Sequence, residues 1–421
     1  MRRAAAAALA LLLLLGGCAG PVQPDKSDGP LVYTDWSKLD AVETAPLVGE
    51  RWYDEYTGEL IPHEYGTLVP YAGLRLAEGW PADSGCLYGL MTIDGVAVTD
   101  PVYSDVYHPG YWDGSVLPHM LPVLVLVRGK QPNNPDMGAE KLYALAAEDG
   151  SWCTEFEYAG VMAAPEGLLL LRADGADWVT LDGTVGTVTK SWTAEQMGLT
   201  DKDFQNALNE FRWGEGVNGD RKQGWIALCW ADVEGTDALH IFRPADGAHD
   251  VISYDDWHAM DNGAEQSGDW DVRVEGNTTV LTRGEETVTI DHPAGEGGVE
   301  IGAGVVVFRD DGLVYNMAGE KLFDFGPNRY VTFEKDKMLD VDAPGLVLAY
   351  SSADAGEMEI EYYLASGTKV ATAQPDETTG EYSPRVSQLC GIVEVLESDT
   401  ASYYETESMT CIFRTRLSIG G

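Results

Sequence analysis

The stretch that most constrains the fold is a short alternating unit, YGLMTIDGVAVTDPVYSDV, which runs from Tyr88 to Val106. Apolar residues alternate up to Ile93, Asp94-Gly95 interrupts them, and the alternation resumes as far as Val98. Alternation on both sides of an Asp-Gly pair predicts a β-hairpin, because glycine accepts the positive φ angle that such a turn needs. The chain is therefore expected to be built from antiparallel strands.

A looser copy of this unit, KLYALAAEDGSWCTEFEYAGVMAAPEGLLLLR, runs from Lys141 to Arg172. Both copies have the same order of residues. A tyrosine with a small residue after it (Tyr88-Gly89 or Tyr143-Ala144) is followed by apolar residues, then by Asp-Gly, and then by a second aromatic residue. This pattern resembles the WG repeat of bacterial surface and secreted proteins, with the Trp-Gly dipeptide itself absent from both copies. In the second copy the matching positions are Tyr143, Asp149-Gly150, Trp152, Tyr158 and Gly167. The resemblance implies an all-β repeat array, and it brings no shared catalytic residues.

Turn signals recur along the chain at spacings of roughly 35 to 60 residues, which overlap the range of propeller blades. The predicted turns are Asp94-Gly95, Asp149-Gly150, Asp182-Gly183, Asp246-Gly247, Gly284-Glu285, Ala318-Gly319 and Ser366-Gly367. Continuous apolar runs, which are typical of strands buried on both faces, are Leu121–Val127, Gly167–Leu171, Val305–Phe308 and Gly345–Ala349. Because such units cannot bury their apolar faces alone, we predict a β-propeller of about seven irregular blades over residues 71–421. An open array of β-repeats is the alternative.

Residues 31–70 form an aromatic and acidic N-terminal segment, with one hairpin expected at Thr57-Gly58. We expect the C-terminal strands Gly391–Leu396 and Cys411–Leu417 to close the ring against this segment.

One insertion, residues 191–213, breaks the β pattern. Thr200 is followed three residues later by Asp203, which is a helix N-capping arrangement. A single apolar stripe then follows at helical spacing, made of Phe204, Ala207, Leu208 and Phe211. The insertion is predicted to be a helix that either covers the end of the ring as a lid or simply packs on one blade.

The N-terminus predicts a lipid-anchored address. Residues 1–17 combine Met1-Arg2-Arg3 with an apolar run, which is the arrangement of a signal peptide, and the run is too short for a membrane span. The Leu-Gly-Gly-Cys ending resembles the lipobox of bacterial lipoproteins, which implies that Cys18 carries the lipid. Ordinary cleavage near Ala19 is the alternative. Residues 18–30 would then be a flexible tether, and the folded part would sit on the extracytoplasmic face of a bacterial cell membrane.

The charge balance excludes one class of partner. The chain has 69 acidic and 27 basic residues, for a formal net charge of −42, so it repels nucleic acid. Such acidity indicates either structural Ca²⁺ binding or a solvated exterior that resists aggregation.

Five cysteines besides Cys18 are present, none of them in a CxxC spacing. Cys390 and Cys411 are equidistant from an expected turn at Thr400-Ala401, which predicts a disulfide between them if the hairpin is regular. The state of Cys86, Cys153 and Cys229 is left open.

The sequence contains no G-x-S-x-G, P-loop, HExxH or complete EF-hand pattern. The one histidine and acid cluster is His249, Asp255, Asp256 and His258, which is a candidate metal site or else a solvated turn. The Pro/Gly-rich aromatic loop from Tyr107 to His119 is the candidate binding rim, and its named members are Tyr107, Tyr111, Trp112 and His119.

Three functional hypotheses follow. The first is a lipid-anchored, non-enzymatic module that binds an extracellular protein or glycan. The second is a carbohydrate-active enzyme with a pair of carboxylates in a funnel. The third is a structural scaffold of an envelope complex, which predicts an apolar surface patch.

Overall fold

The computed structural model describes residues 59–73, 87–111, 119–129, 141–183, 185–213, 221–233, 235–260, 270–295, 298–340, 342–351, 358–375, 382–397 and 400–417. The expected signal peptide, Cys18, the expected tether, the expected turn at Thr57-Gly58, Trp112 and Cys86 lie outside these ranges. Within them, no helix is both long enough and apolar enough to span a bilayer.

The described residues form small antiparallel sheets, which confirms the all-β prediction. The first sheet pairs β1 (Leu68–Gly73) with β2 (Leu87–Thr92). The second has the order β3 (Asp105–Tyr107), β6 (Val123–Gly129) and β7 (Lys141–Ala147), and the hairpin β4 (Gly110–Tyr111) and β5 (His119–Met120) is inserted in it. The third contains β8 (Gly160–Ala164), β9 (Gly167–Leu171), β10 (Gly175–Asp182) and β11 (Val185–Thr193). After α2 (Asp201–Trp213), the fourth contains β12 (Arg221–Lys222), β13 (Trp225–Val233), β14 (Thr236–Arg243) and β15 (Ala248–Ser253), and α3 (Tyr254–Ala259) follows.

The second half of the chain repeats the same plan. Its first sheet contains β16 (Asp271–Glu275), β17 (Thr278–Arg283) and β18 (Glu286–Ile290). The next contains β19 (Val299–Gly302), β20 (Val305–Phe308), β21 (Leu313–Asn316) and β22 (Lys321–Asp324). A third contains β23 (Tyr330–Glu334), β24 (Leu346–Tyr350), β25 (Ile360–Leu364), β26 (Lys369–Pro375) and β27 (Tyr382–Ser383). The last contains β28 (Arg385–Leu389), β29 (Ile392–Leu396), β30 (Thr400–Glu405) and β31 (Cys411–Arg416).

The seven predicted turns are all present where the sequence placed them, between adjacent antiparallel strands or bridged segments. In the first, Gly95 has φ +87° and its N–H donates to the carbonyl of Thr92 at 2.9 Å. A side chain at Gly95 would also meet the carbonyl oxygen of Ile412 at 2.4 Å. Glycine is therefore required there by both the turn and the approach of the last strand.

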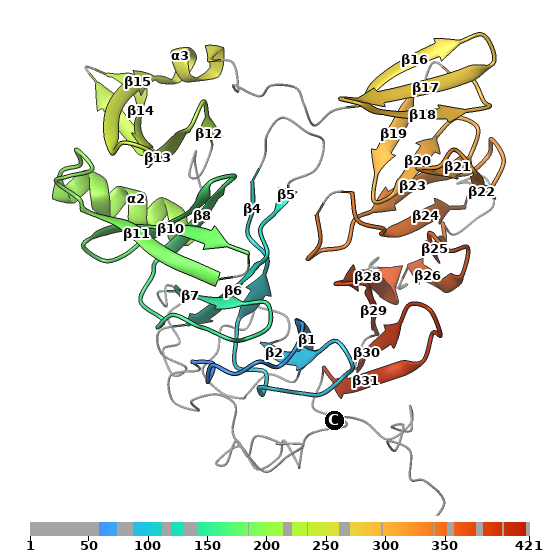
Figure 1. The fold of residues 1–421 in the computed structure, drawn as a ribbon, viewed down its shortest axis with the longest axis horizontal. Coiled ribbons are helices and arrows are strands. Elements are labelled where there is room, and N and C mark those ends of the chain that lie inside the picture. Colours follow the sequence, from blue (N-terminus) through green and yellow to red (C-terminus); the bar gives the residue numbers. More distant parts are fainter. Residues whose placement is uncertain are drawn as a thin grey trace, which may run out of the picture.

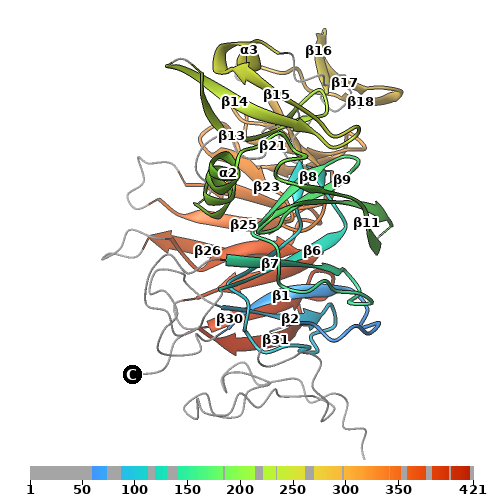
Figure 2. The same cartoon turned by 90° about the vertical axis from the view of Figure 1, so that its left-hand side faces the viewer.

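The sheets follow one another around an arc (Figure 1). One arm of the arc carries β8 to β15, the other carries β16 to β27, and the sheets at the two ends of the chain lie together at its base (Figure 1). A quarter turn of the view shows the sheets of the molecule layered from this base upward (Figure 2).

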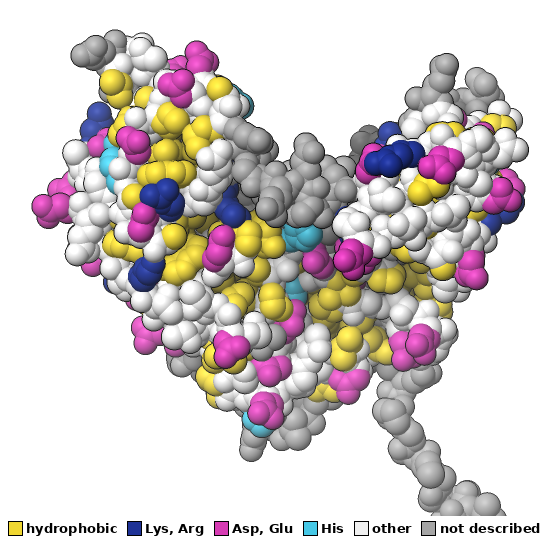
Figure 3. Space-filling model, turned by 45° about the horizontal axis from the view of Figure 1, so that its top comes forward, with side chains coloured by type: hydrophobic (Ala, Val, Ile, Leu, Met, Phe, Trp, Pro, Cys, Tyr) yellow, Lys and Arg dark blue, Asp and Glu magenta, His cyan; other side chains and the backbone are white. Residues whose placement is uncertain are grey.

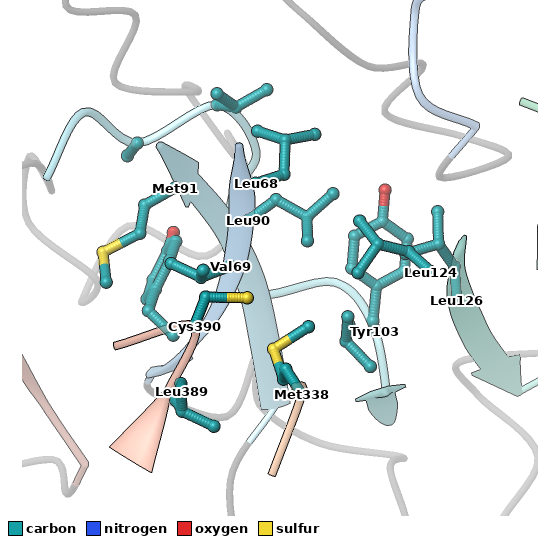
Figure 4. Close-up of a cluster of buried hydrophobic side chains, with 14 of the residues drawn as sticks. Leu68, Val69, Leu90, Met91, Tyr103, Leu124, Leu126, Met338, Leu389 and Cys390 are labelled. Carbon is teal, nitrogen blue, oxygen red and sulfur yellow. The ribbon is translucent and has the colours of Figure 1, made fainter. Parts of the chain in front are cut away.

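The base of the arc is a single hydrophobic core to which both ends of the chain contribute. Leu68 and Val69 of β1 are fully buried with Phe413 of β31, and Figure 4 shows Val69 beside Cys390 and Leu389. The backbone N–H of Ala72 donates to Tyr403 Oη at 2.6 Å, although the two residues are 331 positions apart. The expected contact between the C-terminal strands and the N-terminal segment is confirmed.

The helix expected after Thr200 is confirmed as α2, whereas residues 191–193, expected to begin the insertion, belong to β11. Thr200 Oγ1 accepts the Asp203 N–H at 3.2 Å and donates to the Asp203 carboxylate at 2.6 Å, which is the predicted capping arrangement. The predicted stripe packs into one core with residues of β8, β9, β10 and β13, and its members Phe204, Ala207 and Leu208 are buried. The helix therefore joins two neighbouring sheets.

The predicted disulfide between Cys390 and Cys411 is wrong. Cys390 is a buried thiol outside any disulfide, in the tight turn between β28 and β29 with φ +48°. Thr400 and Ala401, expected to form the turn, instead lie in β30 and pair with Arg416 and Thr415. The strand β30 therefore separates the two cysteines, and Cys411 directs its thiol to the Phe413 carbonyl at 3.4 Å.

Candidate functional site

The predicted binding rim is a hairpin, β4–β5, which we call the central hairpin. Tyr111 and His119 are opposite one another in its register, and their rings stack with centroids 5.5 Å apart. The guanidinium of Arg221 lies 5.9 Å from the Tyr111 ring centroid. Tyr107 lies in β3, and the rings of Tyr107 and Tyr111 both pack, partly buried, against one hydrophobic cluster.

The central hairpin contacts the opposite arm through the connection between β23 and β24, of which residues 335–340 and 342–345 are described and which we call the bridging segment. Lys335 Nζ lies 3.3 Å from Met120 Sδ, and His119 Nδ1 lies 3.0 Å from Asp340 Oδ1. These contacts join residues 215 and 221 positions apart in the chain. Figure 3 shows the surface hollowed between the two arms, with apolar and histidine side chains on the exposed part of its floor.

His108, just before the central hairpin, also contacts the bridging segment. Its Nδ1 lies 2.5 Å from the Met338 carbonyl oxygen of the bridging segment. Burial lowers the pKa of His108 to about 4, so the ring is neutral at pH 7 and Nδ1–H is the donor. Its Nε2 faces Glu148 at 3.4 Å, and burial raises the pKa of that carboxyl.

The bridging segment also borders a cavity of about 440 Å³ between the sheets β16–β18 and β19–β22. We call it the Trp270 pocket. Its lining residues are Trp270, Arg283, Glu286, Thr287, Val288, Ile301, Gly302, Gly304, Met317 and Asp342. Aliphatic, thioether and indole groups therefore share the cavity with polar groups. A volume of a few hundred Å³ is typical of small-ligand sites.

Arg283 organises the polar side of the Trp270 pocket. Its guanidinium lies 4.5 Å from the Trp270 ring centroid. It also donates to the Asp342 carboxylate at 2.9 Å and to the Glu286 carboxylate at 3.0 Å. The hydrogen bond that Arg283 donates to Asp342 is the leading cause that raises the pKa of Arg283. The guanidinium is thus held between two carboxylates.

Three of the four candidate metal residues make other contacts in the structure, and the fourth, Asp255, lies in the first turn of α3. His249 lies in β15, with Nε2 3.0 Å from Nδ1 of His240. Asp256 accepts from the Ser253 hydroxyl at 2.6 Å at the start of α3, and the His258 ring meets Tyr254 edge to face. Across the described ranges, no group of three or more His, Cys, Asp or Glu side chains is placed to hold a metal ion.

The Trp270 pocket was not predicted. One local signal could have indicated part of it. Arg283 is followed three residues later by Glu286, next to a glycine turn, and the two side chains form an ion pair. Arg243 and Asp246 form the same kind of pair. Arg243 also covers a tryptophan, Trp225, at 4.5 Å. No local signal identifies Asp342, which reaches Arg283 from 59 positions away.

The comparisons with known proteins leave the chain without an assigned family. No family model and no curated protein matches it. Among solved structures, a eukaryotic initiation factor is 8% identical with a TM-score of 0.29, covering 83% of this chain and 95% of that one. Apo AztD from Citrobacter koseri is 9% identical with a TM-score of 0.28, over 83% and 95% of the two chains. Kluyveromyces lactis Hsv2 is 8% identical with a TM-score of 0.23, over 80% and 98%. Likenesses at these scores carry no argument about function.

Proposed function

We propose that this chain is a lipid-anchored, extracytoplasmic, non-enzymatic module that binds a protein or a glycan on the inner side of a propeller-like ring. The signal-peptide pattern and Cys18 support the anchor, and the WG-like units support the ring. In the described sheets other than β3-β6-β7 the strands are consecutive in the chain, and the sheets of the two chain ends share a core; both features support a ring.

The observation that carries the proposal is the position of Arg283 in the Trp270 pocket. A glycosidase needs two carboxylates that flank the scissile bond and leave room for the sugar between them. Here the space between Asp342 and Glu286 holds a guanidinium that donates to both, at 2.9 and 3.0 Å. This arrangement suits recognition of a ligand rather than hydrolysis.

The anchor is tested by replacing Cys18 with Ala in cells. Loss of the lipid should release the protein from the membrane fraction, while Cys153→Ala, which removes a thiol in the folded part, should leave the fractionation unchanged. If the Cys18→Ala protein stayed in the membrane fraction after a high-salt wash, the anchoring proposal would be wrong.

Binding through the central hairpin is tested by crosslinking in cells that produce the full-length protein. The double variant Tyr111→Ala with Trp112→Ala should lose a crosslinked partner or glycan that the parent captures, since ring stacking contributes much of the contact energy at such rims. Tyr330→Ala, which removes an exposed aromatic on β23, is the matched control. Equal capture by all three proteins would exclude the central hairpin as the binding rim.

A further inference from the structure

We infer that the Trp270 pocket is a binding site for a neutral pyranose unit of a glycan. The inference rests on the proposed function and adds the chemical class of the ligand.

The charges of the pocket favour a neutral ligand. Arg283 contributes one positive charge, and Glu286 and Asp342 contribute two negative charges, all within one hydrogen-bonded group. An anionic ligand would have to approach a chain of net charge −42 and would find its cation already paired. A cationic ligand would have to compete with Arg283 for the same two carboxylates.

The walls of the pocket suit the two kinds of surface that a pyranose presents. Val288, Ile301 and Met317 line the cavity together with the Trp270 indole, and these groups can cover the C–H face of a sugar ring. The carboxylates can accept from hydroxyl groups, Arg283 can donate, and the Thr287 hydroxyl can do both. A cavity of about 440 Å³ is large enough for a ligand of about one or two rings.

At one wall of the pocket the backbone packs closely against the bridging segment. Gly304 has φ +72°, and a side chain there would lie 3.3 Å from the Pro344 Cα of the bridging segment. A second tryptophan offers an internal comparison, because the Arg243 guanidinium lies 4.5 Å from the Trp225 ring centroid and pairs with an acid three residues later, Asp246. The residues that line the Trp270 pocket do not include it.

The test is calorimetric titration of the full-length protein in detergent. Maltotriose, cellotriose and triacetylchitotriose serve as neutral probes, trigalacturonate as the anionic probe and spermidine as the cationic probe. We expect at least one neutral probe to bind, and Trp270→Ala to weaken that binding about tenfold or more. Trp225→Ala should bind within about twofold of the parent, since it removes the same ring and the same cation contact away from the pocket.

A second variant guards against misfolding. Thr287 is exposed on β18, so Thr287→Tyr should fill the cavity without disturbing the core, and it should also abolish binding. Parent-like thermal melting of both pocket variants is required.

Neutral-probe binding that survives both pocket variants would overturn the inference and leave the proposed glycan module standing. Binding of trigalacturonate or spermidine alone would overturn the neutral class. Binding of no probe at all would also overturn the inference, and the central-hairpin crosslinking would then decide the proposed function separately.

Discussion

At the scale of single residues, the interior of this protein is polar at a few places where segments distant in sequence meet. His108 joins β3 to the bridging segment, and Tyr403 joins the last sheet to the first. In each case one side chain makes hydrogen bonds that water would otherwise supply. The loss of such a group leaves its partners buried and unsatisfied, which costs more than the bond itself contributes.

His108 should make the protein sensitive to acid. Its pKa is about 4 in the folded state and about 6.5 when unfolded, so the unfolded chain binds more protons between these values. Stability from this residue is complete above about pH 6.5 and falls as the pH drops to about 4, by about 3 kcal/mol. Glu148, whose pKa is raised, opposes part of the change.

Urea unfolding of the parent and of His108→Asn between pH 4 and 7 isolates this contribution, because Asn can donate to Met338 and does not titrate. The parent should lose more stability than the variant as the pH falls. Parallel pH profiles would show that His108 is not the titrating group.

Tyr403→Phe should destabilise the fold by about 2 to 4 kcal/mol, since two buried partners lose their hydrogen bonds. Tyr403 Oη accepts from the Ala72 N–H and donates to Glu394 Oε1 at 2.8 Å. Chemical denaturation measures the change. Tyr330→Phe, at a ring that is 50% exposed, is the control and should change stability by less than about 0.5 kcal/mol.

At the scale of strands and helices, the sequence predicted the elements whose formation depends on residues close together in the chain. The glycine-containing turns from Asp94-Gly95 to Ser366-Gly367 and the Thr200 cap are local, so these turns and α2 were predicted correctly, whereas the turn expected at Thr400-Ala401 was not. The Cys390-Gly391 turn was missed because a cysteine at φ +48° has no usual sequence signal. The Trp270 pocket was missed for another reason, since it depends on how two sheets pack and brings Asp342 to Arg283.

The helix cap gives a prediction at this scale. Thr200→Ala should destabilise the protein by about 1 kcal/mol, because the Asp203 N–H loses its acceptor. Thr200→Ser keeps the hydroxyl and should stay close to the parent in thermal unfolding. An equal loss in both variants would point to the methyl group rather than to the cap.

At the scale of the whole molecule, the two ends of the chain depend on one another. Tyr71 of β1 packs its ring 4.8 Å from that of Phe413 in β31, and both are fully buried. The interior of the N-terminal sheet, which also contains Leu124 and Leu126 of β6, is therefore incomplete until the C-terminal sheet is in place. The sequence predicted that the C-terminal strands would lie against the N-terminal segment, but it did not predict which side chains would meet.

Phe413→Ala should cost about 3 to 5 kcal/mol and should speed hydrogen exchange in β1 and β2 as well as in β31. Phe323→Ala, at a partly buried ring in β22, is the comparison and should affect exchange only in its own arm. Protection of β1 and β2 that survives Phe413→Ala would show that the N-terminal sheet is stable by itself.

The shared core also determines when the N-terminal sheet can complete its packing during synthesis of the chain. Ala72 and its partner Tyr403 are 331 residues apart, so at about 5 to 20 residues per second the ribosome needs roughly 20 to 60 seconds to supply the second after the first. During that interval Leu68, Val69 and Leu90 have no completed interior to enter. Until the last strand has been synthesised, the fold cannot bury these side chains fully. We therefore expect the nascent chain to depend on chaperones to prevent aggregation.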